Sequence, residues 1–144
     1  MAVDTALVRN RLDALDGYLR LLKGKALLER SQFLRDPDQY GSGERFLHLA
    51  IEAVFDIGNH CLAGLGLRPP DHYGDIPPAL AQAGVIRRET AGNLSSLAGF
   101  RNVLVHDYLN LDHERVHVFL NSRLDSIRSF AEDIEEFLRR IQTP

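Results

Sequence analysis

The chain has 144 residues, of which 44% are hydrophobic and 26% charged, and its formal net charge is −3. This composition excludes a disordered tail, and the single cysteine excludes a disulfide framework or a cysteine-rich zinc module. No apolar run approaches the ~20 residues that cross a bilayer, and no signal segment follows Met1, so we expect one cytoplasmic domain over residues 1–144 without membrane contact.

Apolar residues recur at helical spacing along nearly the whole chain, and this pattern predicts an all-α fold. The first helix is predicted over about Asp4–Leu22, with Asp4 as its N-cap and a stripe of Val8, Leu12, Leu15, Leu19 and Leu22. A short apolar patch over residues 27–34 predicts one or two further turns. A second long helix is predicted from Asp36-Pro37, an aspartate cap followed by a first-turn proline, to about Gly64.

Two glycines weaken the first turns of this second helix. Gly41 and Gly43 each cost up to ~1 kcal/mol relative to alanine, so the start of the helix could slip to Ser42 or Glu44. Beyond them the pattern is regular, and the apolar stripe consists of Phe46, Ala50, Ala53, Val54, Ile57 and Cys61. We expect Cys61 to be a small core residue rather than a nucleophile.

The second half of the chain continues the helical pattern. A short helix near Pro78–Ala83 is closed by Gly84, and a fourth helix is predicted over roughly Arg88–His106. Asp112 caps the last and longest helix, whose stripe is Val116, Leu120, Leu124, Ile127, Ala131, Ile134, Leu138 and Ile141. The predicted architecture is an up-and-down bundle of about four main helices plus one or two short ones.

One stretch, R-N-V-L-V-H-D-Y over residues 101–108, concentrates the side chains that can carry chemistry. On an ideal helix Asn102 and His106 lie one turn apart, whereas Arg101 and His106 are separated by about 140° around the axis. A single helix therefore points Arg101 and His106 in different directions. A second copy packed across a two-fold axis could bring both pairs together.

The residue types in this stretch suit the cleavage of RNA. An imidazole transfers protons near neutral pH, and a guanidinium stabilises the charge that grows on a phosphate, so neither group needs a metal. His106 would move the proton while Arg101, with Asn102, holds the phosphoryl oxygens during attack by the 2′-hydroxyl. The other interpretation is that His106 caps the helix end and Arg101 pairs with a carboxylate. The acidic balance argues against broad coating of nucleic acid, and no DNA partner is expected.

The stretch also matches the Arg-x4-His-x-Tyr signature of HEPN domains, and the whole chain resembles the HepT ribonuclease toxins. The resemblance covers residues 5–140 and includes FLHLAIEAVFDIG from Phe46 to Gly58, the turn over residues 64–69, AGVI over residues 83–86, and LAGF directly before Arg101. It implies an all-helical HEPN homodimer and a metal-independent ribonuclease, with Arg101 and His106 as catalytic residues in a cleft at the dimer interface.

The resemblance further implies a partner and a modification. HepT toxins are encoded with a minimal nucleotidyltransferase, the MntA antitoxin of a type VII toxin–antitoxin system, which transfers AMP from ATP to the motif tyrosine. Here that acceptor is Tyr108, and Asn102 occupies the usual polar position after the arginine. No phosphate-binding glycine loop is present, so no cofactor other than this covalent AMP is expected. HEPN folds also occur as non-catalytic partners, so an adaptor for the nucleotidyltransferase is the alternative, and a bundle with a purely structural motif is a third.

A ladder of His48, Glu52, Asp56 and His60 recurs every four residues along the second long helix. This spacing could hold a metal, but one helix alone supplies the ligands, and a solvated face of i,i+4 pairs is the simpler interpretation. In the third interpretation, Glu52 and Asp56 face the motif cleft and orient Arg101 or His106, since these positions are typically acidic in the family that the chain resembles.

Overall fold

The computed structural model describes residues 2–106 and 111–142, and every regular element in these ranges is a helix, which confirms the all-α prediction. The elements are α1 (Thr5–Ala26), α2 (Arg30–Arg35), α3 (Pro37–Gly64), the short 3₁₀ helix η1 (Tyr73–Asp75), α4 (Ile76–Gln82), α5 (Arg88–Asn93), α6 (Leu97–His106), α7 (His113–Ser122) and α8 (Leu124–Gln142). None of the helices in the described ranges is long and apolar enough to span a membrane.

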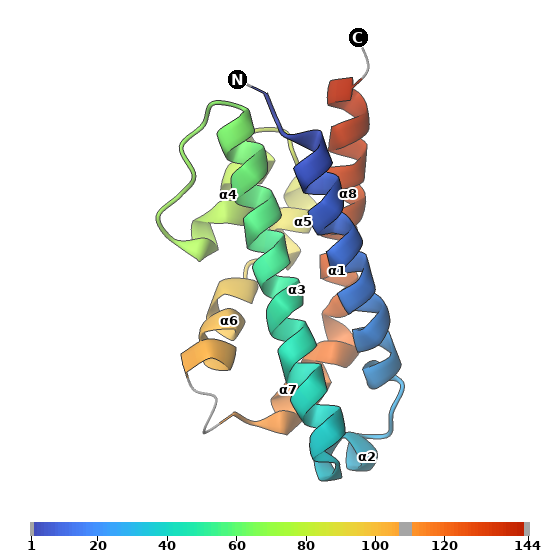
Figure 1. Ribbon diagram of the computed structural model, residues 1–144. Helices are drawn as coiled ribbons and strands as arrows, with labels where there is room; N and C mark the ends of the chain where they lie inside the picture. Colours follow the sequence, from blue (N-terminus) through green and yellow to red (C-terminus); the bar gives the residue numbers. More distant parts are fainter. Residues whose placement is uncertain (1, 107–110, 143–144) are drawn as a thin grey trace.

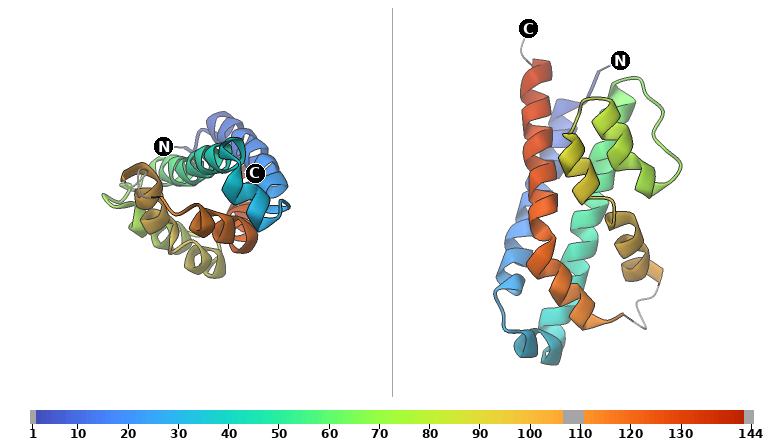
Figure 2. Two further views of the ribbon diagram at one scale, coloured as in Figure 1. Left: turned by 90° about the horizontal axis from the view of Figure 1, so that it is seen from below. Right: turned by 180° about the vertical axis from the view of Figure 1, so that it is seen from behind.

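The helices form an up-and-down bundle (Figures 1 and 2). In the view of Figure 1 the chain descends along α1 and ascends along α3. The connection after α3 runs downward, and the short helix α4 then ascends beside the end of α3, from Ile76 near Gly58 to Ala83 near Leu62. The chain descends again through α5 and α6 and ascends through α7 and α8. The first turn of α1 and the last turn of α8 therefore lie at the same end of the bundle. The predicted up-and-down bundle is confirmed, but the second descending leg consists of the two short helices α5 and α6 rather than one helix over Arg88–His106.

Helix α3 is the centre of the bundle, because α1, α2, α4, α6, α7 and α8 all contact it. It buries residues on more than one narrow stripe, including Leu47, Ile51 and Phe55, which the predicted stripe did not contain. Two members of the predicted stripe, Phe46 and Ala53, are only partly buried. A helix with neighbours on several sides buries a wider arc than a surface helix does.

Helix α3 begins at Pro37, which confirms the start predicted from Asp36-Pro37 and excludes the alternative start at Ser42 or Glu44. The Asp36 side chain accepts a hydrogen bond from the backbone N–H of Asp38, as expected of an N-cap. Gly43 is buried, and a Cβ added there would lie 3.0 Å from a ring carbon of Phe33. Phe33 thus packs closely against Gly43. This packing keeps the segment helical although the low helix propensity of its glycines would weaken it.

The predicted helix over Arg88–His106 is interrupted between Asn93 and Leu97, and this part of the prediction is wrong. Tight i→i−3 hydrogen bonds replace the α-helical pattern there, with the N–H of Ser95 donating to Gly92 and that of Leu97 donating to Leu94. Leu94 and Leu97 both remain buried. The turn lets both leucines reach the core and gives α6, which carries the motif, its own direction.

The predicted last helix is likewise divided, at Arg123, into α7 and α8. Just before the break, Asn121 Nδ2 donates to the carbonyl of His117 at 2.9 Å and Ser122 Oγ donates to that of Val118 at 2.7 Å. Side chains that bond to the carbonyl four residues back weaken and bend a helix. The apolar stripe continues through the break, because the spacing of apolar residues does not reveal side-chain hydrogen bonds to backbone carbonyls.

Packing of α3 against α4 depends on Gly58, and we expect Gly58→Ala to destabilise the fold. An added Cβ would lie 2.8 Å from Ile76 Cγ2 and 3.0 Å from Leu80 Cδ1, and both side chains are fully buried. We expect the free energy of unfolding, measured by urea titration, to fall by about 1–2 kcal/mol, because overpacking outweighs the gain in helix propensity. The matched control is Gly41→Ala, which meets open space and should raise stability by up to ~1 kcal/mol. A Gly58→Ala protein as stable as the wild type would contradict this packing.

Candidate active site

Helix α6 carries the motif, and its apolar side chains fix it against the bundle. Leu97, Phe100 and Leu104 are buried, and the Phe100 ring lies 4.6 Å from the ring of Phe119 on α7. These residues recur every three or four positions, so they form one buried face. Arg101 follows Phe100 directly and projects beside this face, toward α3 and η1.

The guanidinium group of Arg101 is held from two sides. Its Nε donates a hydrogen bond to Glu52 Oε1 at 2.5 Å, and its central carbon lies 4.3 Å from the centre of the Tyr73 ring. Nη1 also contacts Asn102 Oδ1 at 3.5 Å. The side chain is only 18% exposed. Nε and Nη1 thus have partners, whereas Nη2 makes no hydrogen bond with another described residue.

The ladder on α3 is divided between two arginines. Glu52 pairs with Arg101 and lies 3.5 Å from His48 Nε2, whereas Asp56 pairs with Arg11 of α1 at 2.9 Å and contacts His60. The structure therefore brings Glu52 to the motif but places Asp56 with other partners. Within the described residues, no three His, Cys, Asp or Glu side chains gather in a way that could hold a metal ion.

His106 is the last residue of α6, and its side chain is exposed. It makes no hydrogen bond or ion pair with any other described residue, so none of the described side chains links it to Arg101. Both residues lie on α6, where the spacing of five residues predicts that they point about 140° apart, and the described residues show no contact between them. Tyr108, the predicted AMP acceptor, lies outside the described residues.

Burial raises the pKa of the Cys61 thiol from 9.0 to about 12. Its side chain is fully buried on α3. Burial in apolar surroundings disfavours the thiolate, which is the nucleophilic form of cysteine. Cys61 therefore stays protonated at neutral pH and belongs to the core, as the sequence predicts.

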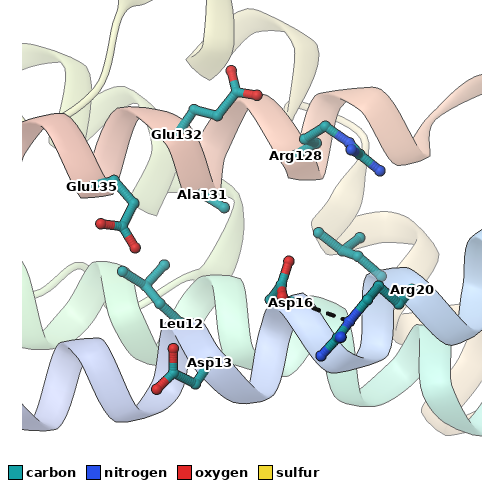
Figure 3. Close-up of a pocket in the computed structure, with 9 residues that line it drawn as sticks. Leu12, Asp13, Asp16, Arg20, Arg128, Ala131, Glu132 and Glu135 are labelled. Carbon is teal, nitrogen blue, oxygen red and sulfur yellow. Dashed lines mark ion pairs between the residues drawn. The ribbon is translucent and has the colours of Figure 1, made fainter.

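Other concave surfaces lie away from the motif. The groove between α1 and α8 is lined by both signs of charge, and Figure 3 shows Asp16 and Glu135 directed toward the space between these helices. Asp16 pairs with Arg20, and Glu135 pairs with Arg9. The local ion pairs account for these charges.

Sequence reasoning missed one residue at the motif, Tyr73. It belongs to the connection between α3 and α4, and no periodic pattern in the sequence marks it as a site residue.

Comparison with known proteins places the motif in a family context. A sequence model described as Ribonuclease HepT-like matches residues 15–134. The mRNA nuclease HepT of Shewanella oneidensis is 36% identical over 110 residues, which cover 75% of this chain and 76% of the relative. The tRNA nuclease HepT of Aphanizomenon flos-aquae is 24% identical over 136 residues, which cover 94% and 92%.

A similar fold is found among solved structures. The tri-AMPylated HEPN toxin of Shewanella oneidensis, solved in complex with MNT antitoxin, matches with a TM-score of 0.79 at 26% identity. The match covers 90% of this chain and 96% of the toxin chain. The expected HEPN fold is thereby confirmed.

Proposed function

The chain belongs to the HepT-like ribonuclease family, and from this premise we propose that it is a metal-independent endoribonuclease toxin. The observation that carries the proposal is the arrangement of Arg101, whose guanidinium is fixed by Glu52 and Tyr73 while its Nη2 makes no hydrogen bond with another described residue. A guanidinium held in this way is arranged in advance to bind two phosphoryl oxygens and needs little reorganisation when negative charge develops there.

In the proposed reaction, the 2′-oxygen of a ribose attacks the adjacent phosphorus and the bond to the 5′-oxygen breaks. One proton leaves the 2′-hydroxyl, and one is delivered to the departing 5′-oxygen. Arg101, supported by Asn102, stabilises the phosphoryl oxygens, and His106 carries the proton as base or acid. The products are a 2′,3′-cyclic phosphate and a 5′-hydroxyl. Exposure of His106 at the end of α6 lets it reach an RNA backbone.

The proposal requires a homodimer. One chain supplies a single His106, which makes no contact with Arg101 among the described residues, whereas the reaction needs a proton acceptor and a proton donor together with the arginine. Two copies related by a two-fold axis supply two imidazoles and two guanidinium groups to one cleft. Glu52 supports this cleft by orienting Arg101. Asp56 supports it less directly, because its ion pair with Arg11 ties α1 to α3.

Regulation is proposed to come from a nucleotidyltransferase antitoxin that attaches AMP from ATP to Tyr108. The matching solved toxin carries AMP groups and is bound by MNT antitoxin. Tyr108 stands two residues after His106 in the sequence. A bulky anion attached to it would compete, by charge and by volume, with an RNA phosphate for Arg101. The system would then be of type VII, with the antitoxin acting as an enzyme on the toxin.

Substrate choice tests the proposed chemistry. We expect the purified protein in EDTA to cut a single-stranded RNA and to leave the DNA oligonucleotide of the same sequence intact, because DNA lacks the attacking 2′-hydroxyl. Labelled substrates resolved on a denaturing gel give the readout. Intact RNA after prolonged incubation would favour the non-catalytic adaptor, and equal cutting of DNA would contradict attack by the 2′-hydroxyl.

A further inference from the structure

The connection between α3 and α4 returns to the motif helix through η1. A Cβ added at Gly74 would meet the Ala98 Cβ of α6 at 3.8 Å, an ordinary packing distance, so η1 rests directly on the first turn of α6. Behind it, the Tyr73 ring lies 4.9 Å from the ring of Phe55, which is buried in α3. Tyr73 is thus fixed between the central helix and the motif helix although it belongs to a connection.

Tyr73 and Glu52 act on different parts of the Arg101 guanidinium. Glu52 accepts the hydrogen bond of Nε along one edge, and the Tyr73 ring lies at cation–π distance from the central carbon. A single hydrogen bond at Nε still allows the planar group to tilt, whereas contact with an aromatic ring restrains its plane. The two contacts together determine where Nη1 and Nη2 point.

The hydroxyl of Tyr73 plays no part in this arrangement, since it has no hydrogen-bond partner among the described residues. Tyr73 is also 37% exposed, so the core does not depend on burying it. Its ring, by contrast, lies against Phe55 and against Arg101. What matters at this position is therefore an aromatic ring rather than a phenol.

We propose that Tyr73 is a positioning residue for RNA cleavage, whose ring holds the guanidinium plane of Arg101 in the orientation that stabilises the phosphoryl oxygens of the transition state. This inference rests on the proposed ribonuclease function and adds a residue to it. Tyr73 acts through Arg101 and need not touch the RNA. Its removal should therefore lower kcat and leave KM nearly unchanged, since the fixed orientation matters most when charge develops in the transition state.

A double-mutant cycle tests this role. Tyr73→Leu and the matched control Tyr73→Phe are measured in the wild type and in Arg101→Lys, whose ammonium has no plane to orient. We expect Tyr73→Phe to stay within about twofold of wild-type kcat and Tyr73→Leu to lose about tenfold, the size of one cation–π contact. In the Arg101→Lys background, Tyr73→Leu should change kcat by less than about twofold.

Three kinetic outcomes would overturn the proposal: an equal loss in both backgrounds, a loss in Tyr73→Phe as large as in Tyr73→Leu, or a raised KM with unchanged kcat. An equal loss would mean that Tyr73 only supports the fold, and a loss in Tyr73→Phe would mean that its hydroxyl is needed. A raised KM would mean that the ring stacks directly on an RNA base. Thermal unfolding of each variant accompanies the kinetics.

A second measurement does not depend on activity. In NMR spectra of arginine-labelled protein, the side-chain signals of Arg101 should show a ring-current shift that persists in Tyr73→Phe and disappears in Tyr73→Leu. The signals of Arg9, which pairs with Glu135 of α8, should stay in place. Absence of the shift in the wild type would overturn the proposal. If the wild type fails to cut RNA, the proposed function fails, and the NMR result still decides whether Tyr73 holds Arg101. If the wild type cuts RNA and the cycle is additive, the role of Tyr73 alone fails.

Discussion

His106→Ala and Arg101→Ala should each reduce RNA cleavage by at least about 10²-fold and remove any growth inhibition, without unfolding the protein. Loss of a general acid–base group costs about 10²–10⁴-fold, and loss of a group that stabilises a developing oxyanion costs about 10²–10³-fold. Neither change should disturb the bundle, because His106 is exposed and Arg101 lies outside the apolar core.

Matched controls separate a catalytic defect from loss of any histidine or arginine. His60 on α3 pairs with Asp56, and Arg30 on α2 pairs with Glu114, and neither lies at the motif. We expect His60→Ala and Arg30→Ala to cleave RNA within about twofold of wild type, since changes at such sites rarely alter stability much. Initial rates on a fluorogenic RNA and circular-dichroism melting curves give the two readouts. Wild-type cleavage by either motif variant would contradict the assignment of that residue.

Incubation with the neighbouring nucleotidyltransferase, ATP and Mg²⁺ should add AMP to Tyr108 and silence the toxin. We expect peptide mass spectrometry to find the modification on the peptide containing Tyr108, and RNA cleavage to fall by at least about tenfold as the fraction of modified protein approaches one. The physical reason is competition: an anionic nucleotide near the motif occupies the guanidinium that an RNA phosphate would use.

Tyr108→Phe provides the matching variant, because it keeps the ring and removes the acceptor oxygen. This protein should remain an active nuclease that the antitoxin no longer silences by modification, and cells that express both proteins should stop growing. The control is Tyr40→Phe in the first turn of α3, where the tyrosine ring stacks on His113 of α7, and this variant should be modified normally. AMP found only on other residues, or full modification of Tyr108→Phe, would refute Tyr108 as the acceptor.

The fold was largely predictable because long periodic stripes dominate this sequence. The stripe of α1 predicted its buried residues correctly, and both Asp4 and Asp36 act as the expected N-caps. The errors lie where local hydrogen bonding or contacts distant in sequence decide the outcome. Asn121 and Ser122 interrupt the last helix by bonding to backbone carbonyls, and Phe33 packing on Gly43 keeps the start of α3 helical.

The site was predictable only as a motif. The sequence predicts that Arg101, Asn102 and His106 share one helix, and the resemblance to HepT toxins supplies their proposed roles. The partners of Arg101 depend on tertiary structure: Glu52 is 49 residues away on α3, and Tyr73 lies in a connection with no periodic pattern. A single chain also cannot specify the two-fold partner that would bring His106 to Arg101.

The chemical identity of the RNA ends after cleavage tests the central claim most directly. We expect mass spectrometry of products formed in EDTA to show 2′,3′-cyclic phosphate, or the monophosphate left by its hydrolysis, on one fragment and a 5′-hydroxyl on the other. These ends require attack by the ribose itself, the reaction to which an arginine and a histidine are suited. Products that carry a 3′-hydroxyl and a 5′-phosphate would contradict the mechanism, because water rather than the 2′-hydroxyl would then be the nucleophile.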